Sequence, residues 1–323
     1  MRSRIFVGLA LILSCLMPGA AARAQIGEQP VRVIFPFAPG GGGDGLARLT
    51  AERLGAGLNR SVIVENRTGS GGRLGIMAVK GGPTDGSMLL VTPIAPMSIY
   101  PLVFKSLSYD PFADFEPISQ IGTNEFAIAV NPNIPAKSVK ELVEWLKANP
   151  SKGSFGVPSA GTLPHFLGVM FARAAGVDLR HVAYRGAAAS VADLVAGHIP
   201  MVVSGTTDLA AMHRDGRVRV LVTSNATRSR FIPDVPTFRE LGYDLLATGW
   251  YGVYAPAKTP RAIIDRYSEI IATAIKMPEV HSKLEQFGQN PTGTTPAELA
   301  AIQKADLEKW APVIKESGFQ PER

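Results

Sequence analysis

Residues 31–49 read VRVIFPFAPGGGGDGLARL, and this stretch sets the fold class. Its first part, residues 31–37, is an apolar run that predicts a buried strand. Apolar residues with helical spacing follow at 46–54. Between them lies a glycine tract, whose backbone can approach a ligand closely and whose N–H groups point outward at a helix start. The stretch therefore predicts the strand, loop and helix of an α/β protein, with an anion site at the loop.

The alternation of strands and helices continues along the chain. Further strands are predicted at 62–65, 88–92, 127–130, 153–157, 181–184, 200–203, 218–222 and 252–255. Strands that alternate with helices are typical of parallel β-α-β units. They fall into two series, so the predicted fold is α/β with two lobes and a ligand cleft between them. Residues 25–126 plus 246–323 are expected to form lobe 1, and residues 127–245 lobe 2.

Three helix starts carry capping signals. Ser138 and Glu141 have the spacing of a capping box, in which two side chains bond backbone N–H groups at the helix start. Thr259-Pro260 and Thr295-Pro296 each place a threonine at the N-cap and a proline at the first helical position. Glu298 completes a second capping box. These signals predict helices that begin at the three points.

The composition is that of an ordinary globular protein. The chain has 323 residues, of which 46% are hydrophobic and 19% charged, and it has one Cys. These values exclude a disordered chain and a disulfide scaffold. The length predicts one large or two medium domains. No basic run indicates a nucleic-acid partner.

Residues 1–24 have the pattern of a secretory signal peptide. Two arginines precede an apolar run at 5–13, and Ala22-Arg23-Ala24 is a suitable cleavage site. The run is far shorter than the ~20 residues that a membrane-spanning helix needs. Cleavage after Ala24 leaves 299 residues with 30 Lys and Arg against 27 Asp and Glu, a net charge of +3. A lipoprotein box ending at Cys15 is the alternative.

The glycine loop allows two functional interpretations. Gly40-x-Gly42-x-x-Gly45 matches the dinucleotide-binding fingerprint, and Glu65 ends the next strand about 20 residues on. This match is the basis of the alternative function, an exported oxidoreductase with a nucleotide cofactor. Against it, Ala38-Pro39 lengthens the turn, and Asp44 places a carboxylate where a pyrophosphate would bind. Asp44 either caps its own helix or contacts a cationic group of a ligand.

A second strand–loop–helix turn contains Ser159-Ala160-Gly161-Thr162. Its hydroxyl and N–H groups are expected at the start of a helix at 164–175, which favours a binding loop. A hydrolase with Ser159 as nucleophile and His165 as base is the alternative, but G-x-S-x-G is absent. The other histidines lack the spacing of metal ligands, and no P-loop is present. Neither a metal nor a cofactor is therefore expected.

Several motifs together resemble one family, the substrate-binding proteins of tripartite tricarboxylate transporters, also called the Bug or TctC-like family. The resemblance covers the whole chain after the signal peptide. The motifs follow the family's order: 35–44, 65–72, 109–111, 159–162 with His165, 184–186 and 234–237.

The resemblance implies a periplasmic, type II-like binding protein without catalysis. Such a protein captures a small carboxylate between its lobes and delivers it to a membrane permease. A monomer without cofactor, metal or nucleic-acid partner is expected. The expected ligand-binding residues are Phe37, Ala38, Pro39, Gly40, Gly41, Gly42, Asp44, Ser159, Ala160, Gly161, Thr162, His165, Tyr184 and Ser204.

Two segments depart from the family pattern beside the expected cleft. Ser204 stands where the family usually has an aspartate, and residues 93–96, Pro-Ile-Ala-Pro, stand where it often has Gly-Thr. The far wall of the cleft is therefore expected to be apolar and without a carboxylate. A ligand ammonium group lacks a partner there unless Asp44 supplies it. We predict that aromatic or aliphatic carboxylates bind more tightly than aspartate or glutamate.

Overall fold

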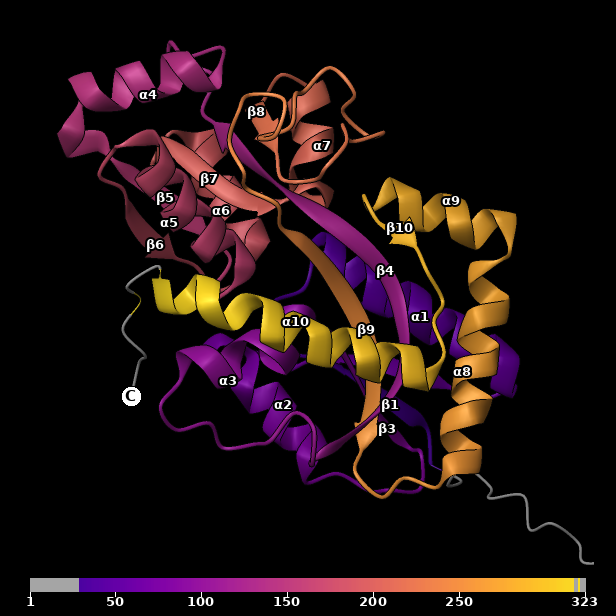
Figure 1. Ribbon diagram of the computed structural model, residues 1–323. Coiled ribbons are helices and arrows are strands. Elements are labelled where there is room, and N and C mark those ends of the chain that lie inside the picture. Colours follow the sequence, from indigo (N-terminus) through magenta and orange to yellow (C-terminus); the bar gives the residue numbers. More distant parts are fainter. Residues whose placement is uncertain (1–28, 317–318, 320–323) are drawn as a thin grey trace, which may run out of the picture.

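The strands of the protein join into one mixed sheet that runs through two lobes (Figure 1). The structure is a computed structural model that describes residues 29–316 and 319. Within these residues the strand order is β2-β1-β3-β9-β4-β7-β5-β6, and β8 and β10 also pair with β4. This arrangement confirms the predicted α/β class. The predicted signal peptide, residues 1–24, lies outside the described residues.

The first lobe, here called the β1 lobe, contains the stretch that opens the chain. β1 (Val31–Phe35) pairs in parallel with β2 (Val62–Asn66) and β3 (Met88–Pro93). The loop after β1 leads directly into α1 (Gly42–Leu58). The other elements of this lobe are α2 (Arg73–Lys80), α3 (Tyr100–Val103), α8 (Arg261–Ile275), α9 (Pro278–Gln286), β10 (Asn290–Pro291) and α10 (Pro296–Glu316), with short helical turns at Ser70–Gly72 and Ala95–Ile99.

The second lobe, here called the β7 lobe, repeats the parallel arrangement. β5 (Ser154–Val157) pairs in parallel with β6 (Arg180–Ala183) and with β7 (Met201–Gly205). β8 (Arg219–Thr223) pairs antiparallel to β4. The remaining elements are α4 (Val139–Ala148), a short turn at Pro150–Lys152, α5 (Leu163–Ala175), α6 (Ala187–Ala196) and α7 (Thr206–Arg214).

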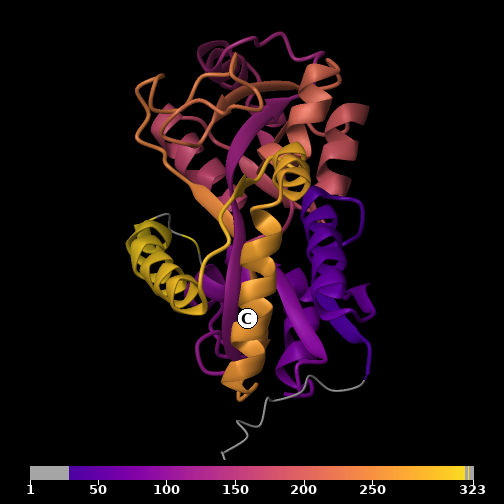
Figure 2. The ribbon, with the colours of Figure 1, turned by 90° about the vertical axis from the view of Figure 1, so that its right-hand side faces the viewer.

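Two long strands connect the lobes. β4 (Phe115–Val130) and β9 (Thr248–Pro256) pair antiparallel to each other and run from one lobe to the other (Figures 1 and 2). β4 begins twelve residues before the predicted strand at 127–130, because its first part is already paired with β9. The predicted lobe boundary after residue 126 falls inside β4, so both boundaries stay a prediction. The antiparallel pairs also make the sheet mixed rather than wholly parallel.

Apolar side chains cover both faces of the sheet. In the β1 lobe, Leu46 and Leu54 of α1 pack with Tyr267 of α8 against the strands, and all three are fully buried. A second cluster fills the other face and extends into the β7 lobe, and a third lies between β4 and the helices α6 and α7. Each fully buried large side chain contributes about 1.5–3 kcal/mol. The cores therefore hold the loops after the strands in fixed positions.

Two of the three predicted helix caps are confirmed. Ser138 Oγ accepts a hydrogen bond from the Glu141 N–H at 3.2 Å. Thr295 and Glu298 form a complete capping box, with bonds of 2.7 and 3.3 Å. The cap at Thr259 is wrong, because its hydroxyl donates backward to the Pro256 carbonyl at 2.7 Å. Among the helices of the described residues, none has the length and apolar character needed to cross a membrane.

Candidate functional site

A cavity of about 100 Å³ lies between the two lobes. It is comparable with the ~150 Å³ cavity that accommodates benzene in another protein, so it suits a small organic ligand. The β1 lobe lines it with Phe35, Phe37, Ala38, Gly41, Gly43, Asp44, Pro93, Ile94, Ala95 and Tyr251. The connecting strand β4 and the β7 lobe line it with Asn124, Phe126, Pro158, Thr162, Leu163, Pro164, Gly186, Ala187, Ala188, Gly205 and Asp208.

The N-terminal ends of four helices meet at this cavity. Gly41 and Gly43 belong to the start of α1, and Thr162 is the N-cap of α5. Gly186 is the N-cap of α6, and Gly205 is the N-cap of α7. Each helix end carries about half a positive charge and unpaired N–H groups. No Lys or Arg is among the described residues that line the cavity, so this positive potential comes from the backbone.

The loop before α1 requires glycine at two positions. Gly40 has a φ of +93°, in the left-handed region that side chains disfavour. At Gly43 a Cβ atom would lie 2.7 Å from Tyr251 Oη and 2.8 Å from Phe35 Cζ. The glycines therefore let the start of α1 turn sharply and pack directly against the sheet.

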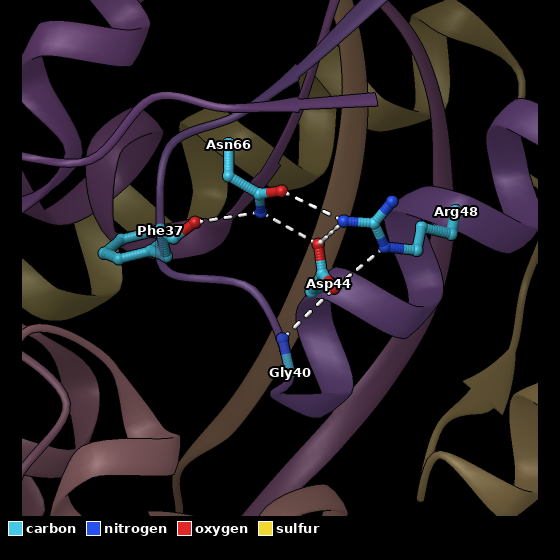
Figure 3. Close-up of polar contacts among 5 residues, drawn as sticks. All are labelled: Phe37, Gly40, Asp44, Arg48 and Asn66. Atoms are coloured by element: carbon cyan, nitrogen blue, oxygen red, sulfur yellow. Dashed lines mark hydrogen bonds and ion pairs between the residues drawn. The ribbon is translucent and has the colours of Figure 1, made fainter. Parts of the chain in front are cut away.

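Asp44 fixes this loop through its own hydrogen bonds (Figure 3). Its carboxylate accepts from Arg48 Nε at 3.0 Å, from Asn66 Nδ2 at 2.8 Å and from the Gly40 N–H at 3.2 Å. Burial by itself raises the pKa of Asp44, but the bonds from these three donors outweigh it and hold the pKa below its usual range. The N-cap of α1 is Gly41, so the interpretation of Asp44 as N-cap is wrong. Asp44 instead ties the loop to the end of β2 through Asn66.

The loop after β5 is held by a buried histidine. The Gly161 N–H donates to His165 Nδ1 at 3.0 Å, and Thr162 Oγ1 donates to the Ser159 carbonyl at 2.8 Å. Burial, together with the neighbouring His181, lowers the pKa of His165 to about 3, so the ring is neutral and accepts this bond. The Ser159 hydroxyl donates to the Ala160 carbonyl at 3.4 Å. The described contacts thus contain no Ser159–His165 hydrogen bond of the kind a hydrolase uses.

The structure brings only some of the predicted site residues to the cavity. Phe37, Ala38, Gly41, Asp44 and Thr162 line it. The residues that do not line it are Pro39, Gly40, Gly42, Ser159, Ala160, Gly161, His165, Tyr184 and Ser204. Of these, Ser159, Gly161, His165 and Ser204 are buried, whereas Pro39 and Gly40 are exposed to solvent.

The side chains of Tyr184 and Ser204 form hydrogen bonds to neighbouring carboxylates. The Tyr184 hydroxyl donates to Asp193 Oδ2 at 2.8 Å, on the adjoining helix α6, and burial followed by this bond raises its pKa to about 12. Ser204 is fully buried and donates to Asp208 Oδ2 at 2.8 Å. Both side chains therefore donate hydrogen bonds to neighbouring carboxylates and do not line the cavity.

Sequence reasoning missed Asp208, Asn124 and Tyr251, which line the cavity from α7, β4 and β9. The expected apolar wall is present at Pro93, but the expectation that no carboxylate lies beside Ser204 is wrong. Asp208 lies in the first turn of the helix that follows β7, where acidic residues are common, and this position was the available signal. Asn124 gave no signal, and Tyr251 only that of an aromatic residue beside Trp250, for which hydrophobic packing was the favoured interpretation, because both reach the site through the crossing of β4 and β9.

The fold and the cavity define a two-lobed α/β binding protein. Residues 46–319 match the tripartite tricarboxylate transporter family receptor, and the chain belongs to this family. Protein BugT of Bordetella pertussis (strain Tohama I) is 30% identical over 90% of both chains. Within the described residues there is no cluster of three or more His, Cys, Asp or Glu side chains that could hold a metal ion.

Solved structures show the same fold. The periplasmic binding protein BugD is 29% identical with a TM-score of 0.87, over 92% of this chain and 100% of its own. An R. palustris protein solved with adipate is 27% identical with a TM-score of 0.88, over 91% of this chain and 98% of its own. The predicted family and the two-lobed binding-protein fold are thus confirmed, and the named structures are of binding proteins or of proteins with a bound small carboxylate.

Proposed function

We propose that this protein is an extracytoplasmic solute-binding protein that captures a small carboxylate and delivers it to a tripartite tricarboxylate-type membrane transporter. The observation that carries the proposal is the meeting of four helix N-termini at a cavity that no described Lys or Arg lines. Such a site attracts a carboxylate through backbone donors. The adipate bound to the R. palustris relative is a ligand of this chemical class.

In this proposal the ligand is held by two opposed sets of N–H groups. The start of α1 binds it from the β1 lobe, and the starts of α5 and α6 bind it from the β7 lobe. Ordered water molecules complete some of these bonds. Phe37, Phe126 and Ile94 provide apolar surface for the body of the ligand. The protein binds and releases the ligand unchanged, without cofactor or metal.

Delivery requires that a permease distinguish loaded from empty protein. The lobes approach each other around the cavity, since a Cβ atom added at Gly186 would lie only 3.7 Å from the Ala38 Cβ. The strands β4 and β9 connect the lobes and provide the hinge. Export by the predicted signal peptide, residues 1–24, places the mature protein in the periplasm. It acts there as a monomer.

The oxidoreductase alternative has little support from the site. The Glu65 carboxylate, expected on a ribose, accepts from Arg67 Nη2 at 2.8 Å and does not line the cavity. The Asp44 carboxylate lies at the start of α1, where the fingerprint places a pyrophosphate. Both features favour a binding site for a smaller anion.

Thermal unfolding of the mature chain, beginning at Gln25, tests the proposal. Adipate, malate, benzoate, aspartate, NAD and FAD are added separately. A ligand at about 100 times its Kd stabilises the folded state by about 2.7 kcal/mol and raises the unfolding midpoint. We expect a rise with at least one carboxylate and none with the nucleotides. A rise with nucleotides alone would refute the proposal in favour of the oxidoreductase.

A further inference from the structure

Asp208 contributes a carboxylate to a site built for anions. It lies in the first turn of α7, lines the cavity and is partly buried. Its Oδ2 accepts from Ser204 Oγ at 2.8 Å, and its Oδ1 faces the Gly42 N–H of α1 at 3.5 Å. A Cβ atom at Gly41 would lie 3.9 Å from the same Oδ1. The carboxylate of the β7 lobe therefore lies against the α1 N-terminus, where a ligand carboxylate is expected to bind.

Among the described residues, no Lys or Arg lines the cavity beside this carboxylate, and its hydrogen bonds come from Ser204 and backbone N–H groups. The elements packed around it carry these other titratable side chains: Asp44, Arg48, Glu52 and Arg53 on α1, Glu116 and Glu125 on β4, His165 and Arg173 on α5, Asp193 on α6, His213 and Arg214 on α7, Arg219 on β8, and Tyr251 and Tyr254 on β9. Asp44 is paired with Arg48, and Arg219 donates to the Ala136 carbonyl at 3.0 Å. Burial raises the pKa of the Asp208 carboxyl, although the bonds from Ser204 and the backbone lower it. Of the two carboxyl groups that line the cavity, Asp208 has a raised pKa and Asp44 a lowered one, so Asp208 takes up a proton more readily.

A ligand with two carboxylates changes the net charge around Asp208. The four helix ends together supply about two positive charges, and Asp208 offsets one of them. One ligand carboxylate can offset the other. A second ligand carboxylate brings a like charge close to Asp208, and two carboxylates in one site drive one of them to bind a proton. A protonated Asp208 can then donate a hydrogen bond to the ligand.

We infer that Asp208 is a specificity-determining residue, which binds one proton when a dicarboxylate without an ammonium group enters the cavity. The inference rests on the proposed function. Asp208 thereby makes affinity depend on pH and on the number of ligand carboxylates.

Titration calorimetry of adipate into the mature wild-type protein tests this directly. Repeating it at about pH 7 in buffers of different ionisation enthalpy gives the number of protons bound. We expect an uptake approaching one proton for adipate and much less for hexanoate, its monocarboxylate counterpart. The adipate affinity should fall by up to about tenfold per pH unit as the pH rises between about 6 and 8.

Two variants identify the group that takes up the proton. Asp208→Asn should abolish the uptake and bind adipate about tenfold more tightly than the wild type at about pH 8, because the amide carries no charge. Ser204→Ala should shift the pH dependence to higher pH, because the Asp208 carboxylate loses a donor. Thermal unfolding checks that both variants fold.

The other outcomes are decisive as well. Adipate binding without proton uptake would overturn the inference and leave the proposed function intact. Tight binding of aspartate that Asp208→Asn abolishes would also overturn it and would make Asp208 an ammonium partner. If no carboxylate binds the wild-type protein while nucleotides do, the proposed function fails and the inference fails with it.

Discussion

At the scale of single residues, Asp44 shows that a carboxylate beside a ligand cavity can also hold the loop around it in place through hydrogen bonds. Its three donors, Arg48, Asn66 and the Gly40 N–H, come from the helix, the next strand and the loop itself. Arg48 is about half exposed, with 52% of its side chain accessible, so its ion pair contributes at most about 1 kcal/mol. The hydrogen bond from Asn66 is part-buried, like the one from Arg48, and adds to this stabilisation.

Asp44→Asn is therefore expected to destabilise the protein by about 1–3 kcal/mol at neutral pH. Because the folded-state pKa of Asp44 is lowered, its stabilisation is present above the unfolded-state pKa of about 4. It is lost as the pH falls through the lower folded-state value. Urea unfolding at about pH 7 and pH 3 measures both effects. Asp178→Asn on the exposed surface is the control, and equal stabilities of the two variants at neutral pH would contradict this account.

At the scale of elements, the start of α1 and the loop after β6 make different contributions to the site. Gly41 lines the cavity and has a φ of −87°, which any residue can adopt. Arg185 is exposed and does not line the cavity. The backbone of α1 is therefore expected to matter more for binding than the nearby cation.

Gly41→Val places two methyl groups in the cavity and is expected to weaken adipate binding at least about tenfold, or 1.4 kcal/mol. Arg185→Ala should change affinity less than about twofold, because an exposed charge acts weakly through solvent. Calorimetry at one salt concentration compares the two variants. Near-equal losses would show that the arginine side chain contributes to the site.

Two side-chain hydrogen bonds near the middle of helix α10 join it to β9, and one of them runs from the Tyr254 hydroxyl to Gln303 Oε1 at 3.2 Å. Trp250 Nε1 on β9 donates to Asp306 Oδ2 on α10 at 2.7 Å. Burial raises the pKa of Asp306, and the bond from Trp250 opposes that rise. The contact therefore compensates an ionised carboxylate that has lost part of its water.

Trp250→Phe is expected to destabilise the protein by about 1–3 kcal/mol at neutral pH, because Asp306 loses its donor. A raised folded-state pKa means that ionised Asp306 costs stability once the pH exceeds the unfolded-state value of about 4. The loss in Trp250→Phe should therefore be larger at about pH 7 than at pH 4. Denaturant unfolding checks this, and adding Asp306→Asn should remove the pH dependence. A pH-independent loss would point to lost packing instead.

At the scale of the whole molecule, the two lobes meet at the cavity and remain connected by only a few strands. The contacts between lobes include Gly186 against Ala38 and Gly161 against Val103. A Cβ added at Gly186 would lie 3.7 Å from Ala38 Cβ, and one added at Gly161 would lie 3.0 Å from Val103 Cγ2, so the lobes approach closely where these glycines have no side chain. The ion pair between Arg230 and Glu285, which also crosses between the lobes, is partly exposed. β4 and β9 run through both lobes and can bend between them (Figure 2).

Saturating adipate is therefore expected to decrease the radius of gyration of the mature protein, because the ligand holds together lobes that otherwise open at the hinge. Small-angle X-ray scattering with and without adipate measures this. Hexanoate at a saturating concentration shows whether a single carboxylate is sufficient. An unchanged radius would indicate a rigid, preformed pocket.

The sequence alone determined the strand, the glycine loop and the helix at 31–54, because local periodicity and turn residues specify them. It also placed the capping boxes at Ser138 and Thr295, which depend on residues three positions apart. The loops after β1 and β5 were also recognised as parts of one site, because each has glycine or hydroxyl residues between a strand and the start of a helix.

Only the tertiary structure decided which of these residues reach the ligand cavity. Tyr184 and Ser204 were expected there, but hydrogen bonds to nearby carboxylates hold them behind it. Asp208 was missed because its place opposite Gly42, which is 166 positions away, depends on how α7 packs against α1. Long-range packing sets the direction of a side chain, and no local pattern of residues encodes it.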